Sequence, residues 1–114
     1  MDRARTADVD LEEVAEGVAL GDLSTGDRAS MMYWRVEPGA TLPVHEHEHE
    51  QIGYVLEGSL TAIVDGEEVT LEEGDAYRFP SGVSHGAENR SDEPTVGIGV
   101  LSPPRDEPDW REGN

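Results

Sequence analysis

A chain of 114 residues has room for one compact domain, and the absence of cysteine excludes disulfides, thiolate ligands and thiol nucleophiles. Its 26 acidic and 8 basic residues, the latter all arginine, give a formal net charge of −18. This balance leaves no basic face for phosphate groups, so we expect neither nucleic acid nor an anionic membrane as a partner.

Composition divides the chain into three parts. Residues 1–17 form a polar, acidic N-terminal segment in which 11–14 could make either one helical turn or an edge strand. Residues 18–104 contain short apolar runs separated by turn residues, which is typical of a single all-β domain. Residues 105–114 form a charged C-terminal tail that we expect to be ordered only in part.

Strands are predicted where runs of β-forming residues end at glycine, proline or Asp-Gly. Asp65-Gly66 is a two-residue hairpin signal, and Pro103-Pro104 ends the last run because proline cannot donate to a β-ladder. About eight strands at this even spacing fit a small closed β-barrel or a jelly roll better than an open sheet. The clearest runs are 29–37, 52–56, 60–64, 69–71, 76–79 and 95–101.

The histidines are the candidate metal ligands. His45, His47 and His49 lie in one five-residue stretch, and His85 follows a turn. Alternation along a strand would place His45 and His47 on one face, and His85 is the histidine left to converge on them from another strand. Imidazole suits first-row divalent metals. A solvated run of histidine and glutamate with an unrelated His85 is the alternative that these residues leave open.

The spacing around the histidines resembles the two motifs of the cupin superfamily. Glutamine stands where the first motif usually has glutamate, and the second motif is filled without a departure. The matching positions are Gly39, His45, His47, Gln51 and Gly58, followed by Gly74, Pro80, Gly82, His85 and Asn89. The resemblance implies a small cupin barrel, or double-stranded β-helix. It also implies one divalent transition metal (Zn, Ni, Mn or Fe) held by His45, His47, Gln51 and His85.

Two residues near these motifs leave alternatives open. Gln51 is either a degenerate ligand in an inactive site or a neutral ligand that leaves the metal's charge uncompensated, which makes a stronger Lewis acid. If Gln51 points inward, so does Gly53, which would leave space beside the metal for a substrate. His49 fits neither motif and is either solvated or a hydrogen-bond donor to a metal ligand, the first being favoured.

The stretch 45–58 is similar to a narrower group, the small single-domain cupins of pectin and alginate degradation. The resemblance covers about residues 26–105, and those enzymes convert ring-closed unsaturated uronates to linear keto sugars. It implies that Arg105 grips the uronate carboxylate, the alternative being an ion pair within the acidic tail. Gly99 stands where the group has an acidic residue, and Leu101 where it has a bulky aromatic one.

These observations predict a metal-dependent enzyme that acts on a small carboxylated sugar, with Gln51 and Arg105 as the catalytic residues. Gly99 favours the alternative of a non-catalytic small-molecule or metal-binding module, and a metal-dependent dioxygenase is a further alternative. The expected ligand is a small anion, and the resemblance also suggests a homodimer.

The charge also bears on where the protein works. A surface this acidic, without lysine, favours a cytoplasm rich in salt, where screening reduces self-repulsion. An ordinary acidic protein is the alternative. The first eleven residues carry charges and no apolar stretch, so we expect no secretory signal and a cytoplasmic location.

Overall fold

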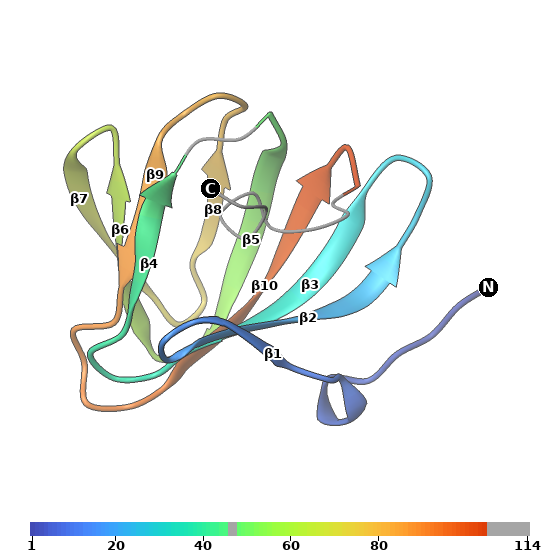
Figure 1. Cartoon of the computed structure of the whole chain (residues 1–114), viewed down its shortest axis with the longest axis horizontal. Helices are drawn as coiled ribbons and strands as arrows, with labels where there is room; N and C mark the ends of the chain where they lie inside the picture. The colour runs from blue at the N-terminus through green and yellow to red at the C-terminus, as the bar shows by residue number, and fades with distance from the viewer. Residues whose placement is uncertain (46–47, 105–114) are drawn as a thin grey trace.

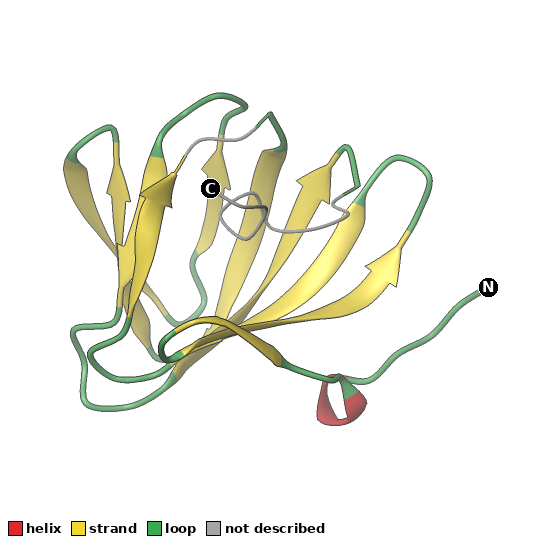
Figure 2. Cartoon of the chain, viewed as in Figure 1, coloured by secondary structure: helices red, strands yellow, loops and turns green. Residues whose placement is uncertain are grey.

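The computed structural model describes residues 1–45 and 48–104. Over these ranges ten strands form two antiparallel sheets that face one another, close together at the bottom of Figure 1 and further apart at the top. A single turn of 3-10 helix, η1 (Thr6–Asp8), precedes the strands, as the red segment in Figure 2 shows. In the described ranges, no helix reaches the length and apolar character that a membrane span requires.

The larger sheet has six strands and begins with the N-terminal segment. Its edge strand β1 settles the alternative left open for residues 11–14 in favour of a strand. The order across the sheet is β1 (Glu12–Ala15), β2 (Val18–Thr25), β3 (Ser30–Val36), β10 (Thr95–Ser102), β5 (Glu50–Glu57) and β8 (Ala76–Phe79).

The smaller sheet has four strands, in the order β4 (Thr41–His45), β9 (His85–Glu88), β6 (Ser59–Val64) and β7 (Glu67–Glu72). The predicted hairpin at Asp65-Gly66 joins β6 to β7, and both residues have positive φ, 51° and 83°, as a type I′ turn requires. The all-β prediction is confirmed, and two sheets packed face to face make the fold a jelly roll.

The core lies between the sheets because side chains alternate along each strand. In β3, Met32, Trp34 and Val36 are buried, whereas Met31 on the other face is exposed. The fully buried side chains include Val18 and Val55 from the larger sheet. They pack into one cluster with side chains from the smaller sheet, namely Leu60, Ala62, Leu71 and Ala87.

Asn89 joins the two sheets at the end of β9. Its side chain is fully buried, and its Nδ2 donates to the carbonyl oxygens of Val36, at 2.9 Å, and Glu93, at 2.8 Å. Its Oδ1 accepts hydrogen bonds from the Ser91 backbone N–H and hydroxyl, at 2.9 and 2.7 Å. The amide therefore uses both donor hydrogens and both acceptor sites, which explains why asparagine suits this position.

Candidate metal centre

Two of the predicted ligands, His45 and His85, are directly paired across strands β4 and β9. Their ring centroids are 4.7 Å apart and the rings are tilted by 58°. Between Leu42 and His45 the register shifts, because β4 carries one residue more than β9. This bulge contains Pro43, which has no N–H to lose from the ladder. The bulge therefore brings His45 opposite His85.

Both imidazoles hydrogen-bond a backbone carbonyl two residues earlier in the chain. The Nδ1 atom of His45 lies 3.0 Å from the Pro43 oxygen, and that of His85 lies 3.2 Å from the Val83 oxygen. A carbonyl only accepts, so Nδ1 carries the hydrogen in both rings and the lone pair of the neutral imidazole resides on Nε2. This is the tautomer in which histidine binds a metal through Nε2. The Nε2 atom of His45 is itself buried.

Gln51, the third described member of the predicted ligand set, belongs to the other sheet. It is buried on the inner face of β5 and is paired across strands with Phe79 of β8. The Phe79 ring in turn stacks on the His85 ring, with centroids 4.2 Å apart and an interplanar angle of 17°. Phe79 thus lies next to Gln51 in the larger sheet and packs against His85 of the smaller sheet.

A tyrosine that the sequence analysis did not identify holds the Gln51 side chain. Tyr77, on β8, accepts a hydrogen bond from the indole N–H of Trp34 at 3.1 Å and is also hydrogen-bonded to Gln51. Burial raises the pKa of Tyr77 above its usual range, and the bonds from Trp34 and Gln51 oppose this effect. The Nε2 end of the Gln51 amide lies beside Gly99, and Gly99 is paired with Gly53, the residue that the Tyr77 hydroxyl covers. The amide nitrogen is therefore the end that faces Tyr77 Oη, and it acts as the donor there.

Gly53 faces inward, as expected for a residue two positions after Gln51, but it does not leave open space. A Cβ at Gly53 would collide with the Tyr77 ring and hydroxyl and would lie 2.6 Å from the Ile98 carbonyl oxygen. The expected substrate space beside Gly53 was therefore wrong, because the Tyr77 ring fills it. Strand alternation indicates which face a glycine presents but not which distant side chain covers it.

Gly99 and Leu101 lie on the inner face of β10, opposite Gly53 and Gln51. A Cβ at Gly99 would lie 3.3 Å from Gln51 Nε2 and 3.3 Å from Met32 Cε. Position 99, where the pectin- and alginate-degrading cupins have an acidic residue, is thus adjacent to the Gln51 amide. Leu101 is buried in the hydrophobic core.

His49 lies in the loop directly before β5. It is half-buried, and its Nδ1 lies 2.7 Å from the Pro103 carbonyl oxygen, a contact that neither alternative for this residue included. This hydrogen bond joins residues 54 positions apart and ties the loop before β5 to the residue that follows β10. His47 and Arg105 lie outside the described residues.

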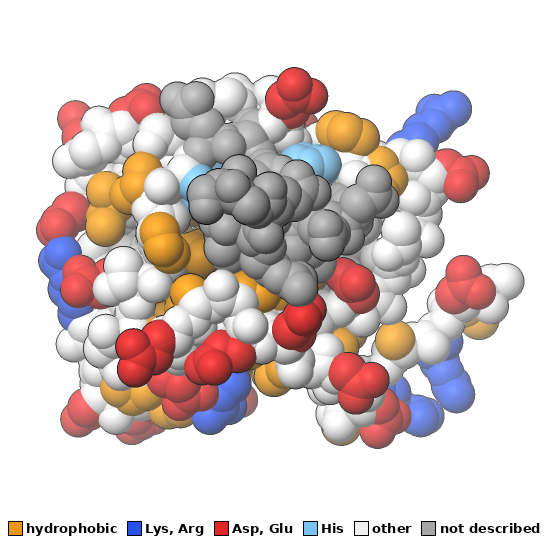
Figure 3. Space-filling model, viewed as in Figure 1, with side chains coloured by type: hydrophobic (Ala, Val, Ile, Leu, Met, Phe, Trp, Pro, Cys, Tyr) orange, Lys and Arg blue, Asp and Glu red, His pale blue; other side chains and the backbone are white. Residues whose placement is uncertain are grey.

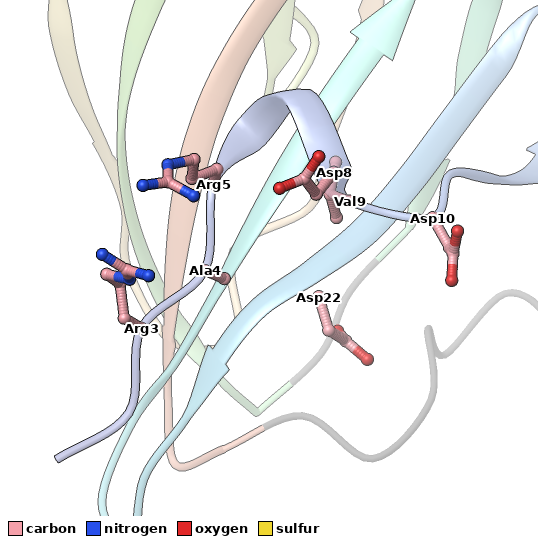
Figure 4. A pocket seen from close by; sticks show the side chains of 7 residues that line it. All are labelled: Arg3, Ala4, Arg5, Asp8, Val9, Asp10 and Asp22. Atoms are coloured by element: carbon pink, nitrogen blue, oxygen red, sulfur yellow. The ribbon is translucent and has the colours of Figure 1, made fainter.

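Within the described ranges, no three His, Cys, Asp or Glu side chains come together as a metal site. The described candidates are two histidines and an amide, since His47 falls outside these ranges. A hollow of about 570 Å³ lies elsewhere, where the N-terminal segment crosses β2, and Figure 4 shows its lining side chains. It is lined by Arg3, Ala4, Arg5, Asp8, Val9, Asp10 and Asp22, and it includes none of the candidate ligands.

With this geometry in place, comparison with known proteins identifies the family. The sequence profile of the cupin domain matches residues 32–100, the part of the chain that contains both motifs. The chain belongs to the cupin family. The resemblance to cupins of pectin degradation is also confirmed. This cupin is 33% identical over 95 residues to the pectin degradation protein KdgF of Dickeya dadantii strain 3937, covering 82% of this chain and 86% of that one.

Solved structures support the same assignment. The cupin matches KdgF from Halomonas sp. with a TM-score of 0.85 at 28% identity, over 93% of this chain and 96% of that one. It matches the polyketide cyclase RemF from Streptomyces resistomycificus with a TM-score of 0.85 at 27% identity, over 94% and 82% of the two chains. One fold thus carries different chemistries among these relatives, so the function of this cupin must be argued from its site.

Proposed function

We propose that this cupin is a metal-dependent enzyme that opens the ring of a small unsaturated uronate. The observation that carries the proposal is that His45 and His85 lie together with their Nε2 lone pairs available, while Gln51 is buried on the inner face of the opposite sheet, beside the Phe79 that stacks on His85. The similarity to KdgF, whose printed name places it in pectin degradation, supports a sugar acid as the substrate class.

In this proposal His45, His47, Gln51 and His85 hold one divalent transition metal (Zn, Ni, Mn or Fe). The described donors fit such an ion, because neutral imidazole and an amide oxygen are ligands that these metals accept. When bound, the metal supplies Lewis-acid polarisation of a substrate oxygen. The Nδ1 hydrogen bonds of the two described histidines fix the ring orientation that this binding needs.

The protein's own residues provide charge and orientation. Gln51 is neutral, so it leaves the full dipositive charge of the metal uncompensated, whereas a glutamate would cancel half of it. The more positive site attracts an anionic substrate into a chain of net charge −18. We propose that Arg105 binds the uronate carboxylate in a bidentate manner, since guanidinium and carboxylate match in geometry.

The test compares metal content and turnover in purified protein and matched variants. We expect near-stoichiometric metal in the wild type and in the control His49→Asn, and loss of metal in His85→Ala and Gln51→Leu. Metal-loaded wild type should consume an unsaturated uronate, and Arg105→Met should raise KM with metal content unchanged. A wild type without metal, or with metal retained in His85→Ala, would overturn the proposed site.

A second candidate function is a non-catalytic binding module, and Gly99 is the observation that favours it. No carboxylate side chain can come from Gly99, so the described part of β10 offers none beside Gln51. Metal binding without uronate turnover, together with tight binding of a small carboxylate, would favour the module. Oxygen consumption by the iron-loaded protein would instead favour the dioxygenase alternative.

We also propose a homodimer that forms through the outer face of the six-stranded sheet. Two rows of uncharged side chains cross strands β5, β10 and β3 on this face, and Ile52 and Tyr54 are 49% and 42% exposed. The rows are Ile52, Val100 and Met31, then Tyr54, Ile98 and Tyr33. These two rows carry no charge, and Arg78, the cross-strand neighbour of Ile52, is ion-paired with Glu50. Two strongly acidic copies can therefore meet along the rows without unpaired carboxylates facing each other. Analytical ultracentrifugation should find Ile52→Glu monomeric and Val69→Glu, on the other sheet, dimeric.

Adaptation to a salty cytoplasm remains a proposal as well. Acidic side chains are spread over the face seen in Figure 3, with few basic ones between them. Their mutual repulsion falls as salt screens it, so the protein should unfold at lower temperature when salt is removed. A melting temperature that does not rise between low and high potassium chloride would contradict the proposal.

A further inference from the structure

A chain of two hydrogen bonds runs from the core to Gln51 and involves no other predicted site residue. The indole N–H of Trp34 donates to Tyr77 Oη at 3.1 Å, and the Gln51 amide is hydrogen-bonded to the same tyrosine. Gln51 Nε2 lies beside Gly99, which is paired with the Gly53 that the Tyr77 hydroxyl covers, so the nitrogen end of the amide faces Oη. All three side chains are enclosed between the sheets, where a lost partner is not readily replaced by water. The Tyr77 hydroxyl is therefore a fixed point for the Gln51 side chain.

The Tyr77 ring is held in place on several sides. It covers Gly53, where any Cβ would strike it, and its centroid lies 5.0 Å from that of Phe79. Trp34 is fixed in the same way over Gly97, where a Cβ would collide with the indole ring. Two glycines on paired strands thus create the space for two aromatic side chains, and these determine where Oη lies.

A fixed Oη matters because glutamine has two different ends. Its oxygen can ligate a metal, whereas its NH₂ group can only donate hydrogen bonds, and the two ends exchange by a half-turn of the side-chain amide. With Nε2 directed to Tyr77, Oε1 occupies the other end of the amide. A carboxylate has two equivalent oxygens and needs no such selection, so the requirement is specific to the glutamine at position 51.

We infer that Tyr77 is a positioning residue that selects the orientation of the Gln51 amide, holding its nitrogen so that its oxygen is presented as the ligand. The inference rests on the proposed function for the ligand role of Gln51. The orientation itself is a property of the metal-free protein and can be measured independently.

The first experiment measures this orientation without metal. Gln51 is the sole glutamine of the chain, so selective ¹⁵N labelling of glutamine side chains gives one NH₂ group in the spectrum. We expect two well-separated hydrogen signals in the wild type and in the control Tyr54→Phe, whose side chain lies on the outer face. In Tyr77→Phe the signals should move to the positions of a free amide. Unchanged signals would overturn the inference.

The second experiment is a double-mutant cycle on metal affinity, using Zn²⁺ with a competing chelator. Tyr77→Phe should weaken Zn²⁺ binding about tenfold in the wild-type background, as expected for loss of a residue that orients a ligand. In the Gln51→Glu background the same change should cost far less, because either carboxylate oxygen can ligate. An equal loss in both backgrounds would indicate a general structural role and would overturn the inference.

The two measurements separate this inference from the proposed function. If the wild type binds no metal, the proposed function fails, and the amide signals still decide whether Tyr77 orients Gln51. If the wild type binds metal and the amide signals do not respond to Tyr77→Phe, the metal site survives and the positioning role is refuted.

Discussion

Replacing Asn89 by alanine removes the side chain that joins the end of β9 to β3 and to the loop before β10. The side chain is fully buried and makes four hydrogen bonds of 2.7 to 2.9 Å, two as donor and two as acceptor. The acceptor on Val36 belongs to a buried residue, so water cannot readily take the place of the lost amide.

The expected loss follows from these bonds. Each contributes about 1 kcal/mol net, and the two groups of Ser91 can recover part of this from solvent, which leaves about 3 kcal/mol for Asn89→Ala. Ser91→Ala is the graded control, because it removes one bond to Asn89 together with two longer, exposed bonds to the Glu93 backbone, which water can replace, and it should cost about 1 kcal/mol. At about 4 °C per kcal/mol, Asn89→Ala should lower the melting temperature by about 12 °C.

Urea unfolding followed by circular dichroism, at one fixed high salt concentration, measures both variants against the wild type. Constant salt matters because repulsion within a chain of net charge −18 also changes stability. An Asn89→Ala loss below about 1 kcal/mol, or one equal to that of Ser91→Ala, would refute the reasoning that the buried amide holds this corner of the fold.

Two further predictions concern packing and charge. Gly53→Ala should destabilise by more than about 2 kcal/mol in urea unfolding, because its Cβ meets the Ile98 carbonyl oxygen at 2.6 Å. The atoms nearest to a Cβ at Gly99 would be the side-chain ends of Gln51 and Met32, each at 3.3 Å, rather than backbone, so Gly99→Ala should stay within about 1 kcal/mol of wild type. Arg90 holds the pKa of Glu68 below its usual range, so the folded state binds fewer protons there and the ion pair stabilises above the unfolded pKa. The stability difference between wild type and Arg90→Met should shrink as the pH falls through the folded pKa of Glu68, and a constant difference would contradict this.

Local signals predicted most of the fold, but no run of β-forming residues marks the strands that bear the histidines. The predicted runs correspond to β3, β5, β6, β7, β8 and β10, whose β-branched and apolar residues reveal them. Strands β4 and β9 hold His45 and His85, and a strand was assumed at each histidine without an apolar run to mark it, since β4 contains a proline within a bulge and β9 is a short segment, His-Gly-Ala-Glu. Their strand conformation comes from pairing with each other and, for β9, with β6.

The candidate site shows the same division. Motif spacing named His45, His85 and Gln51 as candidates, and alternation correctly predicted that Gly53 shares the face of Gln51. The sequence offered no sign of Tyr77, because its bond to Trp34 joins residues 43 positions apart. The same lack of long-range information made Gly53 appear to open a space that the Tyr77 ring occupies.

The sequence by itself determined the all-β class, the hairpin at Asp65-Gly66, the acidic surface and the family, since each depends on composition or on residues close together in the chain. Only the tertiary structure decided the tautomers of the two described histidines, the partner of Gln51 and the filling of the space over Gly53. These features depend on contacts between strands far apart in sequence, where the direction and length of each side chain are set by the packing of two sheets rather than by its neighbours in the chain.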